Sequence, residues 1–350
     1  IRLVKKNDYK NLKFLFLKNS MNIMKKNNWL NLWNNPYLKK KKELGYVLTK
    51  QNKIIAHLGF YPCKYNLNKF NYNSLVLHGL VVNRDYRAAS IPLIKKFFLN
   101  QKSDFLISTT TSEIAAKVLK FFGMQKISIK NLNESRIIIL DFFKFAKFIF
   151  KKKQNFFKKI IFLLVYYFLH LIKIFTNKDH TTTAYKINRF NSKYDDFWKE
   201  YKNKSKFFNL DRNKSYQNWF FSKNINLNTA WIFIVEKNNK IVGYSSANIK
   251  KQNNFRIAYL TDLIALNEDE NVLKDLVSAN IQEVKKKNCI YFELANSSFA
   301  KYKIFQSLGG LPIKWKKNGF YYKSNNTILS RCLKTNLSWT PSSLDGDIAI

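Results

Sequence analysis

The sequence predicts an α/β (α+β) protein made of two similar units, each a mixed, mostly antiparallel sheet flanked by helices. Its 350 residues are enough for two such cores. The same order of elements is read twice, from a short strand and two helices through a hairpin to alternating strands and helices. Landmarks in the two halves recur at a nearly constant separation: Ala56 with Gly243, Gly79 with Asp262, and Gly123 with Gly309. A duplicated unit is the best account of this repeat.

This repeat divides the chain into segments. We expect an N-terminal unit over 1–140, a basic and apolar helical linker over 141–180, a C-terminal unit over 181–325 and a tail over 326–350. In this division, a strand at 136–140 closes the first unit and a strand at 319–323 closes the second.

Turn and cap residues place the elements of the first unit. Asp8 is positioned to cap the first helix, and Gln51-Asn52 separates the two strands of a hairpin. Ser112 is positioned as the N-cap of a helix that Gly123 ends. The expected strands are 2–5, 45–50, 53–61, 71–82, 104–109 and 136–140. The first expected helix begins after residue 8, and the other expected helices are 27–38, 91–100 and 112–122.

The second unit repeats these elements in the same order. A polar turn at 237–239 again separates two hairpin strands, and Gly309 again ends a helix. The expected strands are 185–188, 230–236, 240–246, 255–266, 289–294 and 319–323, and the expected helices are 194–201, 211–221, 272–286 and 298–308.

The net charge is +40 at pH 7. One interpretation is an anionic partner, either nucleic acid or a membrane face. The other is compositional bias, because Lys, Asn, Ile and Phe are enriched together along the whole chain, as an AT-rich genome produces. Forked contacts to nucleic acid favour arginine, which is rare here. We therefore favour compositional bias over a dedicated nucleic-acid surface.

The cysteines and histidines show neither disulfide nor metal-ligand spacing. Cys63, Cys289 and Cys332 are scattered without a CxxC pair, and the four histidines lack a pattern such as HExxH. No signal-peptide pattern begins the sequence. We therefore expect a cytoplasmic protein without a metal site.

The segment 142–175 is both apolar and basic. Four apolar residues fall on one helical face, with lysines around it: Phe142, Phe145, Ala146 and Ile149. The run 160–169 is apolar throughout, but shorter than the about 20 residues that cross a bilayer. Two interpretations remain. The segment is either a pair of linker helices packed on the units, or a basic, aromatic surface on the inner face of an anionic membrane.

The stretch 79–98 carries the clearest chemical signal. A buried strand ends near Val82 and a helix begins at Ile91, with a short turn between them. The first amides of a helix lack internal partners and can bind an anion. Arg84 and Arg87 add positive charge to the same turn. The sequence therefore predicts an anion-binding turn here.

The order of these elements resembles the GNAT acyltransferase fold, and local motifs agree with it. Val81-Val-Asn-Arg-Asp-Tyr-Arg87 is similar to the family's entry into its coenzyme A loop, and 115–124 to the helix that ends in glycine. The stretches 260–266 and 304–310 repeat the resemblance in the second unit. The resemblance implies an acyltransferase that uses acetyl-CoA or another acyl-CoA.

The two ends of the chain carry a narrower resemblance. The tail 339–347, together with Trp29-Leu-Asn-Leu-Trp33, is similar to a bacterial subgroup of tandem GNAT proteins. That subgroup is often associated with cell-surface polysaccharide assembly, which implies a small-molecule or glycan acceptor. The resemblance covers nearly the whole chain apart from the linker.

The coenzyme A loop departs from the family pattern R/Q-x-x-G-x-G/A. It reads Arg87-Ala-Ala-Ser-Ile-Pro92, so that Ser90 replaces the first glycine and Pro92 the last. The carboxylates at 267–271 in the second unit repel a pyrophosphate, so we expect the cofactor on the first unit alone. The resemblance implies these cofactor-binding residues: Val82, Arg84, Arg87, Ala88, Ala89, Ser90 and Ile91.

The family's tyrosine acid has no counterpart, because the matching positions hold Leu119 and Phe305. His78 is the candidate catalytic base, since it lies on the fourth strand near the expected acyl end and imidazole titrates near neutral pH. His57 and Asp262 are candidate substrate-binding residues. Each of the three also fits a purely structural role. We expect Asp345 and Asp347 of the tail to lie in a solvated turn.

The favoured hypothesis is an N- or O-acyltransferase that transfers an acetyl or other acyl group to an amino sugar or glycan precursor. One alternative is an aminoacyl transferase of the FemABX type that uses charged tRNA, motivated by the charge of +40. The other is a non-catalytic pair of GNAT-like units that serves as a binding module, motivated by the missing glycines and tyrosine.

Overall fold

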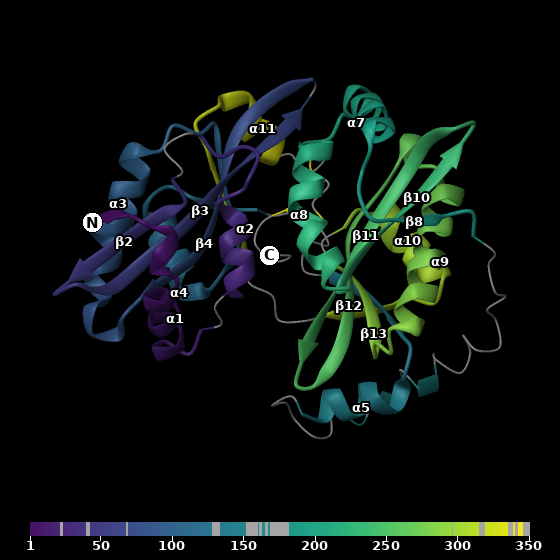
Figure 1. Ribbon diagram of the computed structural model, residues 1–350, viewed down its shortest axis with the longest axis horizontal. Helices are drawn as coiled ribbons and strands as arrows, with labels where there is room; N and C mark the ends of the chain where they lie inside the picture. Colours follow the sequence, from purple (N-terminus) through teal and green to yellow (C-terminus); the bar gives the residue numbers. More distant parts are fainter. Residues whose placement is uncertain are drawn as a thin grey trace.

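The computed structural model describes residues 1–21, 24–39, 43–67, 69–127, 134–151, 160, 163–164, 167–168, 182–295, 297–314, 319–334, 339 and 342–345. It contains two mixed sheets flanked by helices, which confirms the predicted fold class (Figure 1). Most of the linker lies outside the described residues.

The first sheet has eight strands. Seven lie in the order β1 (Arg2–Leu3), β2 (Gly45–Lys50), β3 (Lys53–Leu67), β4 (Phe70–Val82), β5 (Phe105–Thr111), β15 (Gly319–Ser324) and β6 (Gln125–Lys126). The eighth, β9 (Asn209–Leu210), pairs with β3. The ladder between β4 and β5 is parallel, and the other recorded ladders of this sheet are antiparallel.

The second sheet has seven strands. Their order is β14 (Leu311–Lys314), β7 (Glu134–Ile139), β13 (Tyr291–Ala295), β12 (Phe255–Ala265), β11 (Lys240–Gln252), β10 (Ala230–Lys237) and β8 (Tyr185–Ile187). Only the recorded ladder between β12 and β13 is parallel. The two sheets therefore share one plan, as the sequence repeat predicts.

Two strands are exchanged between the halves of the chain. β7 was expected to close the first unit, but it lies between β14 and β13 of the second sheet. β15 was expected to close the second unit, but it lies between β5 and β6 of the first. Both assignments were wrong because β5 and β13 offer equivalent open edges, and the alternation within a strand does not say which edge it joins. The boundaries at 140 and 181 therefore do not separate the two sheets.

Helices from both halves meet between the sheets. They are α1 (Tyr9–Lys18), α2 (Lys26–Leu32), α7 (Ser192–Lys204) and α8 (Lys214–Asn226). Figure 1 shows α2 beside α8 in this middle layer. Trp219 of α8 donates to the carbonyl of Asn31 at 2.7 Å, and the Asn31 amide donates back to the carbonyl of Trp219 at 3.0 Å. These reciprocal bonds join the two halves.

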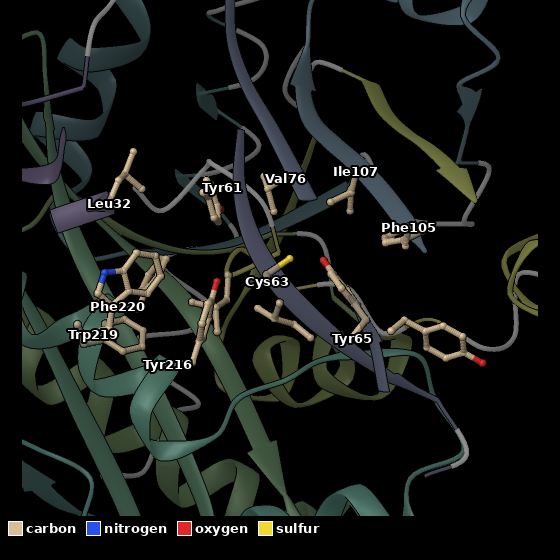
Figure 2. Packing of buried hydrophobic residues seen from close by; sticks show 14 of the residues in the cluster. Leu32, Tyr61, Cys63, Tyr65, Val76, Phe105, Ile107, Tyr216, Trp219 and Phe220 are labelled. Carbon is tan, nitrogen blue, oxygen red and sulfur yellow. The ribbon is translucent and has the colours of Figure 1, made fainter. Parts of the chain in front are cut away.

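One hydrophobic core runs through this layer and across both halves. Figure 2 shows Tyr61, Cys63 and Tyr65 of β3 in the same cluster as Tyr216 and Trp219 of α8. Tyr65 also stacks on Phe208 from the second half, with ring centroids 4.7 Å apart. Burial of such aromatic surface is the main stabilising term between the halves.

Four further helices cover the other faces of the sheets. α3 (Ser90–Asn100) and α4 (Glu113–Phe121) pack on the first sheet, and α9 (Glu270–Lys286) and α10 (Phe299–Ser307) pack on the second. α5 (Phe142–Phe150) buries Phe145, Phe148 and Ile149 beside β7 and β13. α11 (Thr327–Lys334) follows β15. No helix among the described segments is long and apolar enough to cross a membrane.

Local signals explain the matching elements of the two halves. Ser112 accepts a bond from the Ala115 amide at the start of α4, and Ser298 does the same for Lys301 at the start of α10. Gly123 and Gly309 end these helices with φ of 85° and 84°. Asp8 behaves differently from the prediction. Its carboxylate makes no bond to the first turn of α1, but accepts from Arg2 and from the Lys5 amide.

Candidate functional site

Each sheet opens at the same place. β4 and β5 pair over Ser74–Val76 and Phe105–Ile107, and β4 then continues to Val82 beyond the last recorded pair. β12 and β13 pair over Ala258–Leu260 and Phe292–Leu294, and β12 continues to Ala265. Parallel strands that separate in this way expose backbone groups along one edge of the longer strand. The opening in the first sheet leads to the predicted anion-binding turn.

The turn after β4 forms a short 3₁₀ helix, η2 (Arg84–Ala89), that runs directly into α3. Arg84 and Arg87 are exposed on it, as the sequence predicts. The Ser90 amide donates to carbonyls of η2, so it is already engaged within the chain. The Ser90 hydroxyl donates to the carbonyl of Arg87 at 2.9 Å.

The remaining predicted cofactor residues lie around this turn. Val82 ends β4 and is half-buried, Ala88 is exposed, and Ala89 is half-buried at the end of η2. Ile91, in the first turn of α3, is 44 % exposed. The stretch that the sequence marked as an anion site is therefore a turn with two exposed arginines, Arg84 and Arg87, at the end of the β4–β5 opening. That these residues bind a cofactor stays a prediction.

His57 and His78 lie together beside this opening, on the face of the first sheet that α1 covers. Their ring centroids are 6.2 Å apart, and His57 also lies 5.8 Å from Phe16 of α1. Nδ1 of His57 is 2.8 Å from the carbonyl oxygen of Gly79, and a carbonyl accepts, so this nitrogen carries the proton. Gly79 interrupts β4 with a φ of 57°, which turns its carbonyl toward His57.

The backbone at Gly59 makes room for both imidazoles. A Cβ atom there would lie 2.5 Å from Cε1 of His78 and 2.9 Å from Cε1 of His57. These separations are well inside van der Waals contact, so glycine is required at this position. The structure thus brings the predicted base and one predicted substrate residue into a single cluster.

Burial keeps both imidazoles neutral. It lowers the pKa of His57 to about 3, with a further contribution from the neighbouring His78, and it lowers the pKa of His78 to about 4. Within the described part of the chain, neither Nε2 atom has a hydrogen-bond partner. Because Nδ1 of His57 carries the proton, its Nε2 is a buried, unprotonated nitrogen without a described partner, which is costly to the fold and is available to accept a proton.

The matching position in the second sheet holds a buried ionic cluster instead. Asp262 accepts from Nε of Arg212 at 2.5 Å and from the hydroxyl of Tyr244. The side chains of Arg212 and Asp262 are 2 % and 0 % exposed. Asp262 therefore makes an ion pair with one oxygen, while its Oδ1 has no partner among the described residues. A substrate-binding role for Asp262 stays a prediction.

The tail joins this cluster. Arg212 reaches the hydroxyl of Ser342 at 3.2 Å and the carboxylate of Asp345 at 3.7 Å. Asp345 is fully buried, so the prediction of a solvated turn was wrong for it. Burial raises the pKa of its carboxyl, which Arg212 partly opposes. Asp347 lies outside the described residues.

Lys301 of α10 interacts electrostatically with this cluster. It is buried, and burial lowers its pKa while the charge of Asp262 opposes that shift. The sequence analysis missed Arg212, Tyr244 and Lys301. The available signal was Arg212 itself, a rare arginine in a lysine-rich chain directly after Asp211.

The turn of the second sheet places a carboxylate at the N-terminus of the helix that follows it. η3 (Leu266–Glu268) precedes α9, and the Asp269 carboxylate accepts from the amides of Asn271 and Val272 at 2.9 and 3.2 Å. A carboxylate in this position occupies the donors that an anion would use. That the second unit does not hold the cofactor stays a prediction.

Comparison with known proteins supports the fold assignment. No family model and no curated protein match the sequence. Yeast (Saccharomyces cerevisiae) N-myristoyltransferase with bound myristoyl-CoA superposes with a TM-score of 0.57 and 13% identity, over 92% of this chain and 78% of that one. A putative acetyltransferase from Pyrococcus horikoshii has a TM-score of 0.54 and 8% identity, over 93% and 89% of the two chains.

A third similar structure is a GCN5-related N-acetyltransferase from Anabaena variabilis. Its TM-score is 0.57 at 10% identity, over 92% of this chain and 72% of that one. These similarities extend over both sheets rather than over one of them, because more than nine-tenths of the chain is aligned in each case. The chain therefore has the fold of GNAT-type N-acyltransferases.

Proposed function

We propose that the protein is an acyl-CoA-dependent N- or O-acyltransferase whose reaction takes place in the first sheet. The observation that carries this proposal is the β4–β5 opening, which runs from the exposed Arg84 and Arg87 to the neutral imidazoles of His57 and His78. The shared fold supports it, since one of the similar structures holds myristoyl-CoA.

The basic turn fits the anionic end of such a cofactor. Arg84 and Arg87 supply fixed charge, and the free edge of β4 supplies backbone groups for an extended arm. The cofactor would supply the activated acyl group as a thioester. The Ser90 amide is engaged by η2, so the two arginines carry more of the binding than in a glycine-rich loop.

His78 is the proposed general base. Its lowered pKa keeps the imidazole neutral at neutral pH. In the tautomer whose Nε2 carries no proton, this nitrogen, unpartnered among the described residues, accepts the proton that the acceptor amine or hydroxyl loses. His57 acts as a positioning residue. Its bond to the Gly79 carbonyl fixes the ring, and the ring limits the orientations open to His78.

Binding of acetyl-CoA to the full chain tests the first part of this proposal. Calorimetry should give one site, and the double variant Arg84→Glu/Arg87→Glu should weaken binding at least tenfold. The control Lys240→Glu/Lys251→Glu changes the net charge equally at exposed positions of the second sheet. Absence of binding to the wild-type chain, or equal weakening by both variants, refutes the proposal and favours a non-catalytic binding module.

The acceptor class rests on sequence resemblance. We propose an amino sugar or glycan precursor, and acetyl transfer to such acceptors in the presence of acetyl-CoA is the direct test. Charged tRNA is the competing substrate. Turnover with an aminoacyl-tRNA and none with acetyl-CoA would replace this proposal by the FemABX-type alternative.

We further propose that α5 contacts an anionic membrane surface. Phe143 and Phe150 are 79% and 43% exposed on it, beside exposed lysines, and the net charge of +40 favours an anionic partner. Phe143→Ser/Phe150→Ser should reduce co-sedimentation with phosphatidylserine vesicles. The control Phe121→Ser removes a ring that is 78% exposed on α4 and should leave sedimentation unchanged. Equal sedimentation of the wild-type chain and both variants contradicts the proposal.

A further inference from the structure

A cavity of about 830 Å³ lies beside the first sheet, away from the basic turn. The last turn of α3 contributes Phe97 and Asn100 to its wall, and the loop that follows contributes 101–103. The basic turn precedes the other end of the same helix. The 11 residues of α3 span about 16 Å, so the cavity and the turn are separate places on the molecule.

The strands explain why the cavity exists. β2 pairs with β3 from Gly45 opposite Gly59, but β3 continues to Leu67, where it pairs with the start of β4. α3 ends at Asn100 and covers only part of this long hairpin. The lining residues come from the hairpin, from α3 and its following loop, and from the chain before β2.

The floor of the cavity is apolar and aromatic. Tyr46, Phe60 and Phe97 are buried there, with ring centroids 5.7 Å apart between Tyr46 and Phe60 and 5.2 Å between Phe60 and Phe97. Leu75 of β4 completes this surface and is half-buried. A preformed aromatic wall of this kind binds an apolar body without losing side-chain freedom.

The rim of the cavity is basic. Lys39, Lys64 and Lys102 line it, and Glu43 is the one acidic residue among the described lining residues. Nζ of Lys64 lies 5.3 Å from the centre of the Tyr37 ring. That ring is itself fixed, because the Tyr37 hydroxyl donates to Asp211 at 2.7 Å. Lys64 is therefore held at the rim rather than extended freely into solvent.

We propose that this cavity binds an amphipathic anion, a small molecule that joins an apolar body to a phosphate or carboxylate group. The apolar body lies on Tyr46, Phe60 and Phe97, and the anionic group lies between Lys64 and Lys102. The volume is within the range of about 300 to 1,000 Å³ that is typical of small-molecule sites. The site is independent of the proposed acyl-CoA site, since the two share none of their lining residues.

Binding of 1-anilinonaphthalene-8-sulfonate to the full, folded chain tests the proposal. This probe is itself an amphipathic anion whose fluorescence rises on an apolar surface. We expect one saturable site that Lys64→Glu/Lys102→Glu weakens at least tenfold and that the charge-matched control Lys240→Glu/Lys251→Glu leaves unchanged. Leu75→Trp should also abolish binding, because the larger ring fills the cavity while the lysines remain.

Competition identifies the apolar body. Displacement of the probe by myristate assigns an acyl chain, and displacement by adenosine monophosphate assigns a flat ring system. Either result supports the proposal. The proposal is overturned if neither compound displaces the probe, or if Lys240→Glu/Lys251→Glu weakens probe binding as much as Lys64→Glu/Lys102→Glu does. It is also overturned if Leu75→Trp leaves probe binding unchanged and acetyl-CoA displaces the probe. The last result would place the probe at the basic turn.

Discussion

Replacement of Asp262 by asparagine tests the buried ionic cluster of the second sheet. Arg212 is 2 % exposed and has two carboxylates, Asp262 at 2.5 Å and Asp345 at 3.7 Å. Asp262→Asn keeps the size of the side chain but removes the closer charge. Removal of one partner from a buried ion pair costs about 3 to 5 kcal/mol, because the other charge stays buried. We expect the lower end of this range, since Asp345 remains.

The size of the effect should follow the structure. Asp345→Asn should cost less than Asp262→Asn because its carboxylate lies farther from Arg212. The double variant Arg212→Met/Asp262→Leu removes both charges and should recover most of the loss, as buried ion pairs often tolerate apolar replacement. The two substitutions should therefore couple by about 2 kcal/mol or more in a double-mutant cycle.

Urea unfolding followed by tryptophan fluorescence measures these differences. With a slope of about 3 kcal/mol per molar urea, Asp262→Asn should lower the midpoint by about 1 M. The matched control is Asp195→Asn, which breaks a pair with Lys214 at 2.6 Å in which the aspartate side chain is 47% exposed. This control should cost less than about 1 kcal/mol. Similar midpoints for the two variants, or no coupling in the cycle, would refute the reasoning.

Three further predictions concern the first sheet and the helix caps. The folded pKa values of His57 and His78 lie near 3 and 4, so below about pH 6.5 the unfolded chain binds more protons than the folded chain. The free energy of unfolding should therefore fall as the pH drops from 6.5 to 4, by roughly 1 to 3 kcal/mol per pH unit for the two histidines together. A double His→Gln variant should flatten this slope, and an unchanged slope would contradict the assignment. Gly59→Ala should cost about 1 to 3 kcal/mol in urea unfolding and abolish acyl transfer, because its Cβ displaces both imidazoles; wild-type stability would show that the rings move freely. Ser112→Ala and Ser298→Ala should each cost about 1 kcal/mol by the same measurement, since each removes an N-cap bond, and a cost at only one site would contradict the equivalence of the two helices.

Elements encoded by short stretches could be predicted from the sequence. The hairpin turns at Gln51-Asn52 and Asn238-Asn239 form with positive φ, as two-residue hairpin loops require. The strand, turn and helix around Arg84 form where the pattern of apolar and basic residues placed them. In each case the signal lies within about a dozen residues, and local backbone preference decides the outcome.

Features that depend on distant partners could not be predicted in this way. The buried ionic cluster joins three distant parts of the chain. Arg212 lies just before α8, Asp262 lies in β12 and Asp345 lies in the tail, and nothing in their local sequences indicates that they meet. Asp345 lies among polar residues that normally form a solvated turn. It is buried instead, where its carboxylate lies near the guanidinium of Arg212. The sheets that β7 and β15 join could not be predicted for the same reason, because the geometry of the available sheet edges decides which strands pair.

The exchange of β7 and β15 constrains how the chain can be made. A ribosome releases the first sheet's strands β1 to β5 early, but β15 emerges only after residue 319 has been synthesised. Until then, β5, most of which is buried in the folded chain, exposes an unpaired edge that another chain could pair with. Until β15 has been synthesised, this edge is therefore a place where nascent chains can associate. A chain that ends before β15 would keep that edge of β5 open and would therefore be prone to aggregation.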